Sequence, residues 1–149
     1  MNVAVLMGSA NDKPKMAPAV DTLESFGVTA TEHVMSAHRT PAVVAEFARG
    51  ARGAGYGIII CGAGMAAHLA GAVAGQTTLP VIGVPLSGGA IGGIDALYAT
   101  VQMPRGVPVA TVAIDGAANA AILAVQVLAI HDDALAERLA AYRAEWLKA

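Results

Sequence analysis

The fold is decided by the stretch GIIICGAGMAAHLAG, residues 57–71. Its first part holds three consecutive isoleucines, residues 58–60, and such a continuous β-branched run is typical of a strand that is covered on both faces. The segment GAG, residues 62–64, ends this run, and we expect a helix of small residues to begin near Met65. A buried strand followed by a turn and a helix is the repeating unit of a parallel α/β fold.

The same unit recurs in both directions along the chain. The predicted strands cover residues 3–7, 28–35, 57–61, 79–84 and 107–114. The predicted helices follow Asp12, Thr40 and Met65, and others cover residues 95–101, 119–130 and the C-terminal segment, where Leu135, Leu139, Tyr142 and Trp146 form one stripe. Alternation of this kind predicts one α/β domain over residues 1–149, a three-layer α/β/α sandwich around a parallel five-stranded sheet.

Two polar residues are the expected starts of helices. The side chains of Asp12 and Thr40 can accept hydrogen bonds from the free amides of a first helical turn. Pro14 and Pro41 fit that first turn, because proline has no N–H to leave unpaired there. Pro18 predicts that the first helix begins late or bends.

The composition predicts an oligomer and disfavours some partners. Hydrophobic residues make up 56% of the 149-residue chain and charged residues only 13%, whereas soluble domains have about 25% charged residues. Too few charged side chains are present to cover a monomer, so we expect a homo-oligomer. The helix predicted at residues 119–130 is apolar on nearly all sides, so we expect it to be buried in such an assembly. The net charge of −2 and the lack of a basic patch argue against nucleic acid and anionic membranes as partners.

One long region of the chain carries no acidic side chain, lysine or arginine, as a membrane-spanning segment would. No Asp, Glu, Lys or Arg occurs from Gly53 to Ile94. Frequent glycines, together with Pro80 and Pro85, favour short buried strands and turns over a membrane-spanning helix. The single cysteine, Cys61, and an N-terminus without signal-peptide features predict a cytoplasmic protein.

Two of the loops that follow predicted strands carry groups suited to a ribonucleotide. Ligands of open parallel sheets bind at the carboxyl ends of the strands. Ser9, Ser36 and Arg39 supply hydroxyls and a guanidinium that can hold a phosphate, and Asp12 can accept hydrogen bonds from ribose hydroxyls. In the alternative interpretation, Asp12 and Ser36 are ordinary helix caps and Arg39 is a solvated loop residue.

A third loop, after the isoleucine run, leads to His68. This histidine is the only side chain between residues 53 and 94 that readily exchanges a proton near neutral pH, so it is a candidate general acid/base. The alternative is a core histidine that donates to a carbonyl. Histidine spacing offers no metal-binding pattern, and Cys61 at a strand end is expected to act as a small hydrophobe rather than a nucleophile.

Four motifs, in order, resemble one family across almost the whole chain. MGSAND is similar to the family's MGSxSD, and SAHRT matches its second loop. GAGMAAHLAG is similar to a GAGGAAHLPG-type segment, and ALYATVQMPRGVPVATVAI resembles a later signature. The chain thus resembles the PurE family, the class I N5-carboxyaminoimidazole ribonucleotide mutases of de novo purine biosynthesis.

The resemblance implies a flavodoxin-like fold, a homo-octamer and an isomerase reaction. The substrate would be N5-carboxyaminoimidazole ribonucleotide and the product 4-carboxy-5-aminoimidazole ribonucleotide, made without metal or organic cofactor in IMP biosynthesis. The segment 102–104 would approach a neighbouring subunit's site. The resemblance implies that Ser9, Ser36 and Arg39 hold the 5′-phosphate, Asp12 the ribose, His68 acts as general acid/base, His38 lies in a mobile catalytic loop, and Gly62, Ala63, Gly64 and Leu69 also bind substrate.

The sequence departs from the family pattern in three places, and two other functions are compatible with it. Ala70 replaces a common proline, residues 88–93 form an unusually glycine-rich loop, and a longer C-terminal tail is missing, which predicts weaker packing between subunits. One rival is the class II aminoimidazole ribonucleotide carboxylase, which uses CO2 directly; the AAHL segment favours the mutase. The other is a non-catalytic nucleotide-binding module, which would not need His68.

Overall fold

In the computed structural model, which describes residues 2–148, β3 (Tyr56–Gly64) is the central strand of a five-stranded parallel sheet. Its side chains alternate between two cores: Ile58 and Ile60 lie in one, and Ile59 and Cys61 lie in the other. The predicted strand covered on both faces is confirmed, because each isoleucine is fully buried. Burial also raises the pKa of the Cys61 thiol.

The strand order is β2-β1-β3-β4-β5 and every pairing is parallel. The other strands are β1 (Asn2–Met7), β2 (Ala30–Val34), β4 (Val81–Leu86) and β5 (Ala110–Thr111). Register places Val5 of β1 opposite Ile60, which lies opposite Ile82 of β4. The two ends of the sheet differ from its centre, since β2 is half exposed and β5 has only two residues.

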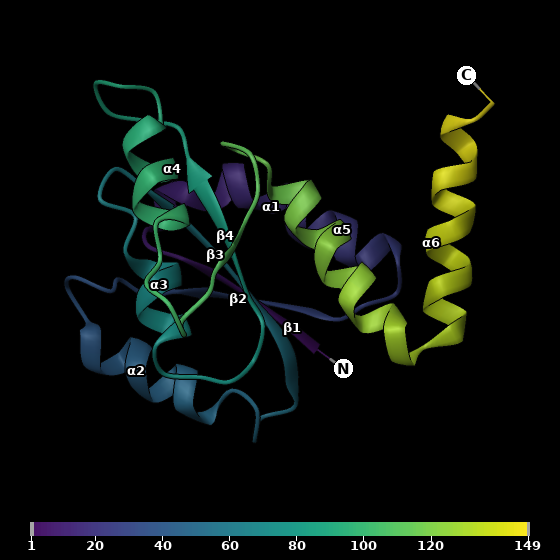
Figure 1. The fold of residues 1–149 in the computed structure, drawn as a ribbon, viewed down its shortest axis with the longest axis horizontal. Coiled ribbons are helices and arrows are strands. Elements are labelled where there is room, and N and C mark those ends of the chain that lie inside the picture. The colour runs from purple at the N-terminus through teal and green to yellow at the C-terminus, as the bar shows by residue number, and fades with distance from the viewer. Residues whose placement is uncertain (1, 149) are drawn as a thin grey trace.

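Helices cover both faces, which makes the predicted three-layer sandwich (Figure 1). On one face, α1 (Lys13–Ser25) and α5 (Ala117–Leu128) pack on Val5, Ile58 and Ile60. On the other face lie α2 (Pro41–Gly50), α3 (Leu69–Ala74) and α4 (Ile94–Val101). Short 3-10 turns, Ala10–Asp12 and Ala129–His131, precede α1 and follow α5.

The last helix, α6 (Asp133–Trp146), stands beyond α5 at the edge of the molecule (Figure 1). Asp132 caps it by accepting a hydrogen bond from the Leu135 amide at 2.9 Å. Only part of the predicted apolar stripe reaches the core. Leu135 is buried, whereas Trp146 is 68% exposed and contacts Tyr142. Within residues 2–148, each helix is too short or insufficiently apolar to cross a membrane.

Several predicted boundaries were wrong, and the backbone explains why. β3 extends to Gly64, and α3 starts at Leu69 rather than near Met65, because Met65 adopts a left-handed φ of 52° that no helix accommodates. β4 was predicted to end at residue 84 but continues through Pro85. Proline has no N–H to donate to a neighbouring strand, and none is needed here because β5 pairs with β4 only as far as Gly83. Pro18 does not delay α1, which begins at Lys13.

Candidate functional site

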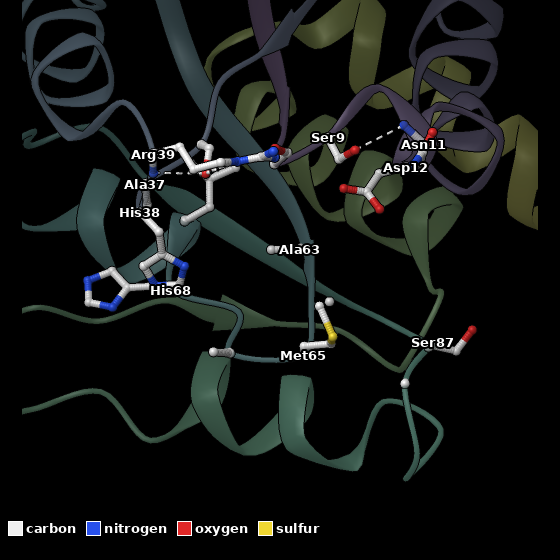
Figure 2. Close-up of a pocket in the computed structure, with 17 residues that line it drawn as sticks. Ser9, Asn11, Asp12, Ala37, His38, Arg39, Ala63, Met65, His68 and Ser87 are labelled. Atoms are coloured by element: carbon white, nitrogen blue, oxygen red, sulfur yellow. Dashed lines mark hydrogen bonds between the residues drawn. The ribbon is translucent and has the colours of Figure 1, made fainter.

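A cleft of about 790 Å³ opens at the carboxyl ends of the central strands. The chain passes from β1 outward to β2 and then crosses back to β3 on the other side of β1. Such a reversal leaves a crevice between the loops of β1 and β3, where ligands of open α/β sheets bind. Loops that follow β1, β2, β3 and β4 contribute the walls (Figure 2).

The cleft brings together most of the residues singled out from the sequence. Nine of the ten candidate residues line it: Ser9, Asp12, Ser36, His38, Arg39, Ala63, Gly64, His68 and Leu69. These residues are up to 60 positions apart in the chain, and the order of the strands in the sheet brings their loops together. The tenth, Gly62, does not line the cleft.

The loop after β2 is held by its own side chains. The Thr40 hydroxyl donates to the Ser36 carbonyl at 3.0 Å and accepts from the Ser36 amide at 3.2 Å. The Ser36 hydroxyl accepts from the Arg39 amide at 3.2 Å. Thr40 occupies the N-cap position of α2 but makes no capping bond, so the predicted side-chain cap is wrong because its hydroxyl closes this loop instead.

Arg39 connects the loops of β1 and β2. Its Nη2 donates to the Gly8 carbonyl at 3.4 Å, and its Nε lies 3.5 Å from the Ser36 hydroxyl. Figure 2 shows the guanidinium extended from the His38 side of the cleft toward Ser9. A planar guanidinium near the hydroxyls of Ser9 and Ser36 is suited to a phosphate group.

The loop after β1 presents a carboxylate to the cleft. The Ser9 hydroxyl accepts from the Asn11 amide at 3.2 Å and caps the 3-10 turn. Asp12 makes no side-chain capping bond to α1, so the interpretation of Asp12 as an ordinary cap is wrong. Burial raises the pKa of Asp12, although the Ser9 amide and the Lys15 ammonium oppose the rise. The Asp12 carboxylate makes no capping bond and lines the cleft, so it can accept hydrogen bonds from a ligand's hydroxyls.

His68 stands at the start of α3 and faces the cleft. After β3 the chain turns sharply, with the Ala67 amide donating to the Met65 carbonyl at 2.8 Å. This turn places His68 at the N-cap of α3, exposed and among the residues that line the cleft. The alternative of a core histidine is therefore wrong. The His38 ring lies edge-on to it, with ring centroids 5.5 Å apart.

The floor between these groups is backbone and small side chains. A Cβ at Gly64 would lie 3.4 Å from the Leu86 carbonyl, and one at Gly62 would overlap the Met16 sulfur at 2.3 Å. Gly62 therefore faces α1 beneath the cleft, because alternate residues of a strand point to opposite faces. A side chain at this position would point away from the cleft, and the binding of substrate by Gly62 stays a prediction. Ala63 and Gly64 leave space for a flat ring.

Sequence reasoning missed a further group of residues around the cleft. They come from the four strand-end loops and include the start of the glycine-rich segment after β4: Gly8, Asn11, Ala37, Met65, Ala66, Ser87, Gly88 and Gly89. Ser87 could have been found, since it follows the end of a predicted strand in the same way as Ser9 and Ser36. Among residues 2–148, no three His, Cys, Asp or Glu side chains gather closely enough to hold a metal ion.

Comparison with known proteins shows the family of this chain. Two curated proteins named N5-carboxyaminoimidazole ribonucleotide mutase are close relatives. The protein of Brucella melitensis is 50% identical over all of this chain and 91% of its own length. That of Synechocystis sp. is 52% identical over 95% of this chain and 80% of its own length.

A solved structure and a family model extend the similarity. The crystal structure of Treponema denticola PurE superposes with a TM-score of 0.90 at 26% identity, covering 98% of this chain and 91% of that one. The family model described as AIR carboxylase matches residues 2–148. Fold and sequence thus agree, and the chain belongs to the AIR carboxylase, or PurE, family.

Proposed function

We propose that this chain converts N5-carboxyaminoimidazole ribonucleotide into 4-carboxy-5-aminoimidazole ribonucleotide, a step of IMP biosynthesis. The observation that carries the proposal is the exposed imidazole of His68 in the cleft that also contains Ser9, Ser36 and Arg39. A proton-transfer group and an anion-binding group are thereby available to one ligand. The names of the curated relatives support the same reaction.

Substrate binding divides between the loops of β1 and β2. The Arg39 guanidinium and the hydroxyls of Ser9 and Ser36 would hold the 5′-phosphate, because charge-assisted hydrogen bonds from a guanidinium fit phosphate oxygens. Asp12 would accept hydrogen bonds from the ribose hydroxyls. Gly64 and Leu69 would flank the imidazole base.

His68 would serve as acid in one step and base in the next. The N–CO2 bond of the substrate breaks to release CO2, and the electron pair left on the exocyclic nitrogen takes a proton from protonated His68. C4 of the ring then attacks the CO2, forming a C–C bond. His68 removes the C4 proton, which restores the aromatic ring and returns the histidine to its starting state. General acid/base catalysis of this kind contributes about 10²–10⁴-fold.

The surroundings of His68 support this use. Three residues that line the cleft with it, Ala63, Gly64 and Ala66, carry no charge that would repel a carboxylate. A floor of small residues also leaves room for the flat base beside the imidazole. Holding CO2 next to C4 would convert its capture into a proximity effect.

A direct carboxylase is the second candidate, because the family model is described as AIR carboxylase. The two reactions share a product but differ in substrate. We would incubate the protein with N5-carboxyaminoimidazole ribonucleotide, or with aminoimidazole ribonucleotide and bicarbonate, and follow the ultraviolet absorbance of the carboxylated imidazole. Faster turnover of the first substrate supports the mutase. Turnover of the second alone makes the protein a carboxylase, and binding without turnover makes it a nucleotide-binding module.

We also propose that the protein assembles as a homo-octamer. Apolar side chains of α4 and the loop before it are exposed in the single chain, among them Ile91, Ile94, Tyr98 and Val101, and such a patch favours burial between subunits. Gln102–Pro104 follows α4, with Met103 over Gly71 of α3, and would approach a neighbour's cleft. Sedimentation velocity of the purified protein tests the octamer.

A cytoplasmic location stays a prediction from the sequence.

A further inference from the structure

Ser87, at the end of β4, is held by two residues that the proposed reaction does not use. Its amide donates to Asp115 Oδ1 at 2.8 Å, and its hydroxyl donates to Asp115 Oδ2. The Lys15 ammonium donates to both the carbonyl and the hydroxyl of Ser87. Lys15 and Asp115 also form an ion pair, with Nζ 3.5 Å from Oδ1. All the polar groups of Ser87 are therefore fixed from α1 and from the loop before α5.

The loop that starts at Ser87 has little conformational preference of its own. Residues 88, 89, 92 and 93 are glycines with positive φ, and glycine loses more backbone entropy on ordering than any other residue. Gly88 and Gly89 nevertheless line the cleft, as does Ser87. Contacts outside the loop must therefore fix its position, and those at Ser87 supply them at its first residue.

The backbone conformation and the charge of Asp115 both suit it to hold Ser87. Its backbone has a left-handed φ of 56°, and its amide donates to the Pro85 carbonyl at 2.9 Å. Left-handed conformations of residues other than glycine persist only where the surroundings enforce them. Burial raises the pKa of Asp115, but hydrogen bonds from the Ser87 hydroxyl and amide, with the Lys15 charge, outweigh it and lower that pKa. The carboxylate is thus ionised throughout the neutral range.

Lys15 also lies close to the substrate side of the cleft. It is one turn along α1 from Asp12, which lines the cleft, and its charge acts on the Asp12 carboxylate. One ammonium therefore stabilises two walls of the cleft, the loop after β1 and the loop after β4.

We propose that Lys15 and Asp115 are positioning residues for substrate binding, which hold Ser87 and thereby keep the start of the glycine-rich loop, residues 87–93, against the cleft. The proposal rests on the proposed function for its kinetic readout only. Exposed ion pairs contribute little to stability, and both side chains are more than a third exposed. The expected effect is therefore on substrate affinity and loop order rather than on folding.

The test compares Lys15→Met with Lys15→Arg and with Lys13→Met in the full-length protein. Lys13 lies in the same turn of α1 and pairs with Glu32 at 3.2 Å, so its replacement removes the same charge without contact to Ser87. We would measure hydrogen–deuterium exchange of the peptide covering residues 87–93 in the substrate-free protein, and kcat and KM with N5-carboxyaminoimidazole ribonucleotide. Asp115→Asn is the second variant, since it keeps the side-chain shape.

For Lys15→Met we expect exchange of the loop peptide to accelerate about tenfold and KM to rise about tenfold, while kcat stays within about threefold of wild type, because His68 is not displaced. Asp115→Asn should change exchange and KM in the same direction, and Lys15→Arg should restore both. Lys13→Met should behave as wild type. If Lys15→Met matches Lys13→Met, or accelerates exchange with KM unchanged, the proposal is overturned. A wild-type protein without turnover refutes the proposed function alone, because loop exchange still tests the role of Lys15.

Discussion

The imidazole rings of His38 and His68 meet edge to face, with centroids 5.5 Å apart and an interplanar angle of 65°. One ring comes from the loop after β2 and the other from the start of α3, so the contact joins two walls of the cleft. A shift of the 36–40 loop would therefore change the surroundings of His68 directly.

Replacement of His68 by asparagine should nearly abolish turnover while substrate still binds. Asparagine keeps a hydrogen-bonding side chain but cannot exchange a proton near neutral pH. We expect kcat to fall by about 10²–10⁴-fold, with the dissociation constant measured by calorimetry within about threefold of wild type. His131→Asn is the control, because His131 is exposed and outside the cleft. Turnover close to wild type in His68→Asn would refute the acid/base role.

The His38→Asn variant should act through His68. If His38 orients or shields the neighbouring imidazole, its loss should lower kcat in the wild-type background but add little to His68→Asn. Residues in direct contact show such coupling, commonly 0.5–3 kcal/mol. A double-mutant cycle of kcat/KM measures the coupling. Fully additive effects would indicate that the two rings act independently.

Arg39→Lys should weaken substrate binding although it keeps the positive charge. Lysine cannot donate to two phosphate oxygens in a fixed plane, and a hydrogen bond to a charged group contributes about 1.5–3 kcal/mol. We expect KM to rise at least about tenfold with a smaller change in kcat. Arg49→Lys on α2, where Arg49 donates to Gln76 at 2.8 Å, is the matched control. An unchanged KM would exclude a phosphate-binding role for Arg39.

The stability of the fold should decrease at mildly acidic pH because of His33 on β2. Burial lowers the pKa of this imidazole, which lies 3.0 Å from the Tyr56 hydroxyl and stacks on Phe47. Since the unfolded chain takes up the proton first, stability is present above pH 6.5 and is lost as pH falls through the folded pKa. Melting temperatures at pH 7.5 and 5.5 should differ less in His33→Gln than in wild type or His131→Gln. An equal acid shift in all three would refute this account.

Gly83→Ala should destabilise the fold through crowding of side chains rather than through backbone strain. A Cβ at Gly83 would approach Thr100 Cγ2 at 2.3 Å and Val109 Cγ1 at 3.0 Å. The Thr100 side chain is buried and donates to the Ala96 carbonyl, so it cannot move freely. We expect a loss of about 1–3 kcal/mol in urea unfolding, typical of overpacking. Gly50→Ala, with nothing within 4 Å, should be neutral or slightly stabilising; an equal loss there would contradict the packing argument.

The sequence predicted the elements that depend on local pattern. Ile58–Ile60 indicated a central strand, and the loops that follow apolar runs indicated Ser9, Ser36 and Arg39 as neighbours, because parallel strands end at one edge. It failed where a single backbone angle decides the outcome: the left-handed φ of Met65 delays α3 to Leu69, and no residue type signals this conformation. Asp12 and Thr40 occupy the predicted N-cap positions, but neither side chain makes the capping bond; the Thr40 hydroxyl bonds to Ser36 instead.

Contacts between distant segments lay beyond sequence reasoning altogether. The Lys15–Ser87 contact spans 72 positions and the Ser87–Asp115 contact 28, and polar residues in loops carry no periodicity that would pair them. The family resemblance implied that Gly62 binds substrate, whereas strand alternation directs this position toward Met16. The predicted strand ended three residues too early, so this alternation was not extended to Gly62.

The buried Cys61 has a practical consequence for following this molecule in solution. It is the chain's single thiol, lies only 1% exposed within the sheet, and is therefore inert toward alkylating dyes while the fold is intact. An Ala90→Cys substitution in the exposed segment after β4 would consequently accept a fluorophore at one defined position, without replacement of the native Cys61. Emission from that probe would report on the surroundings of the glycine-rich loop as a ligand binds in the cleft.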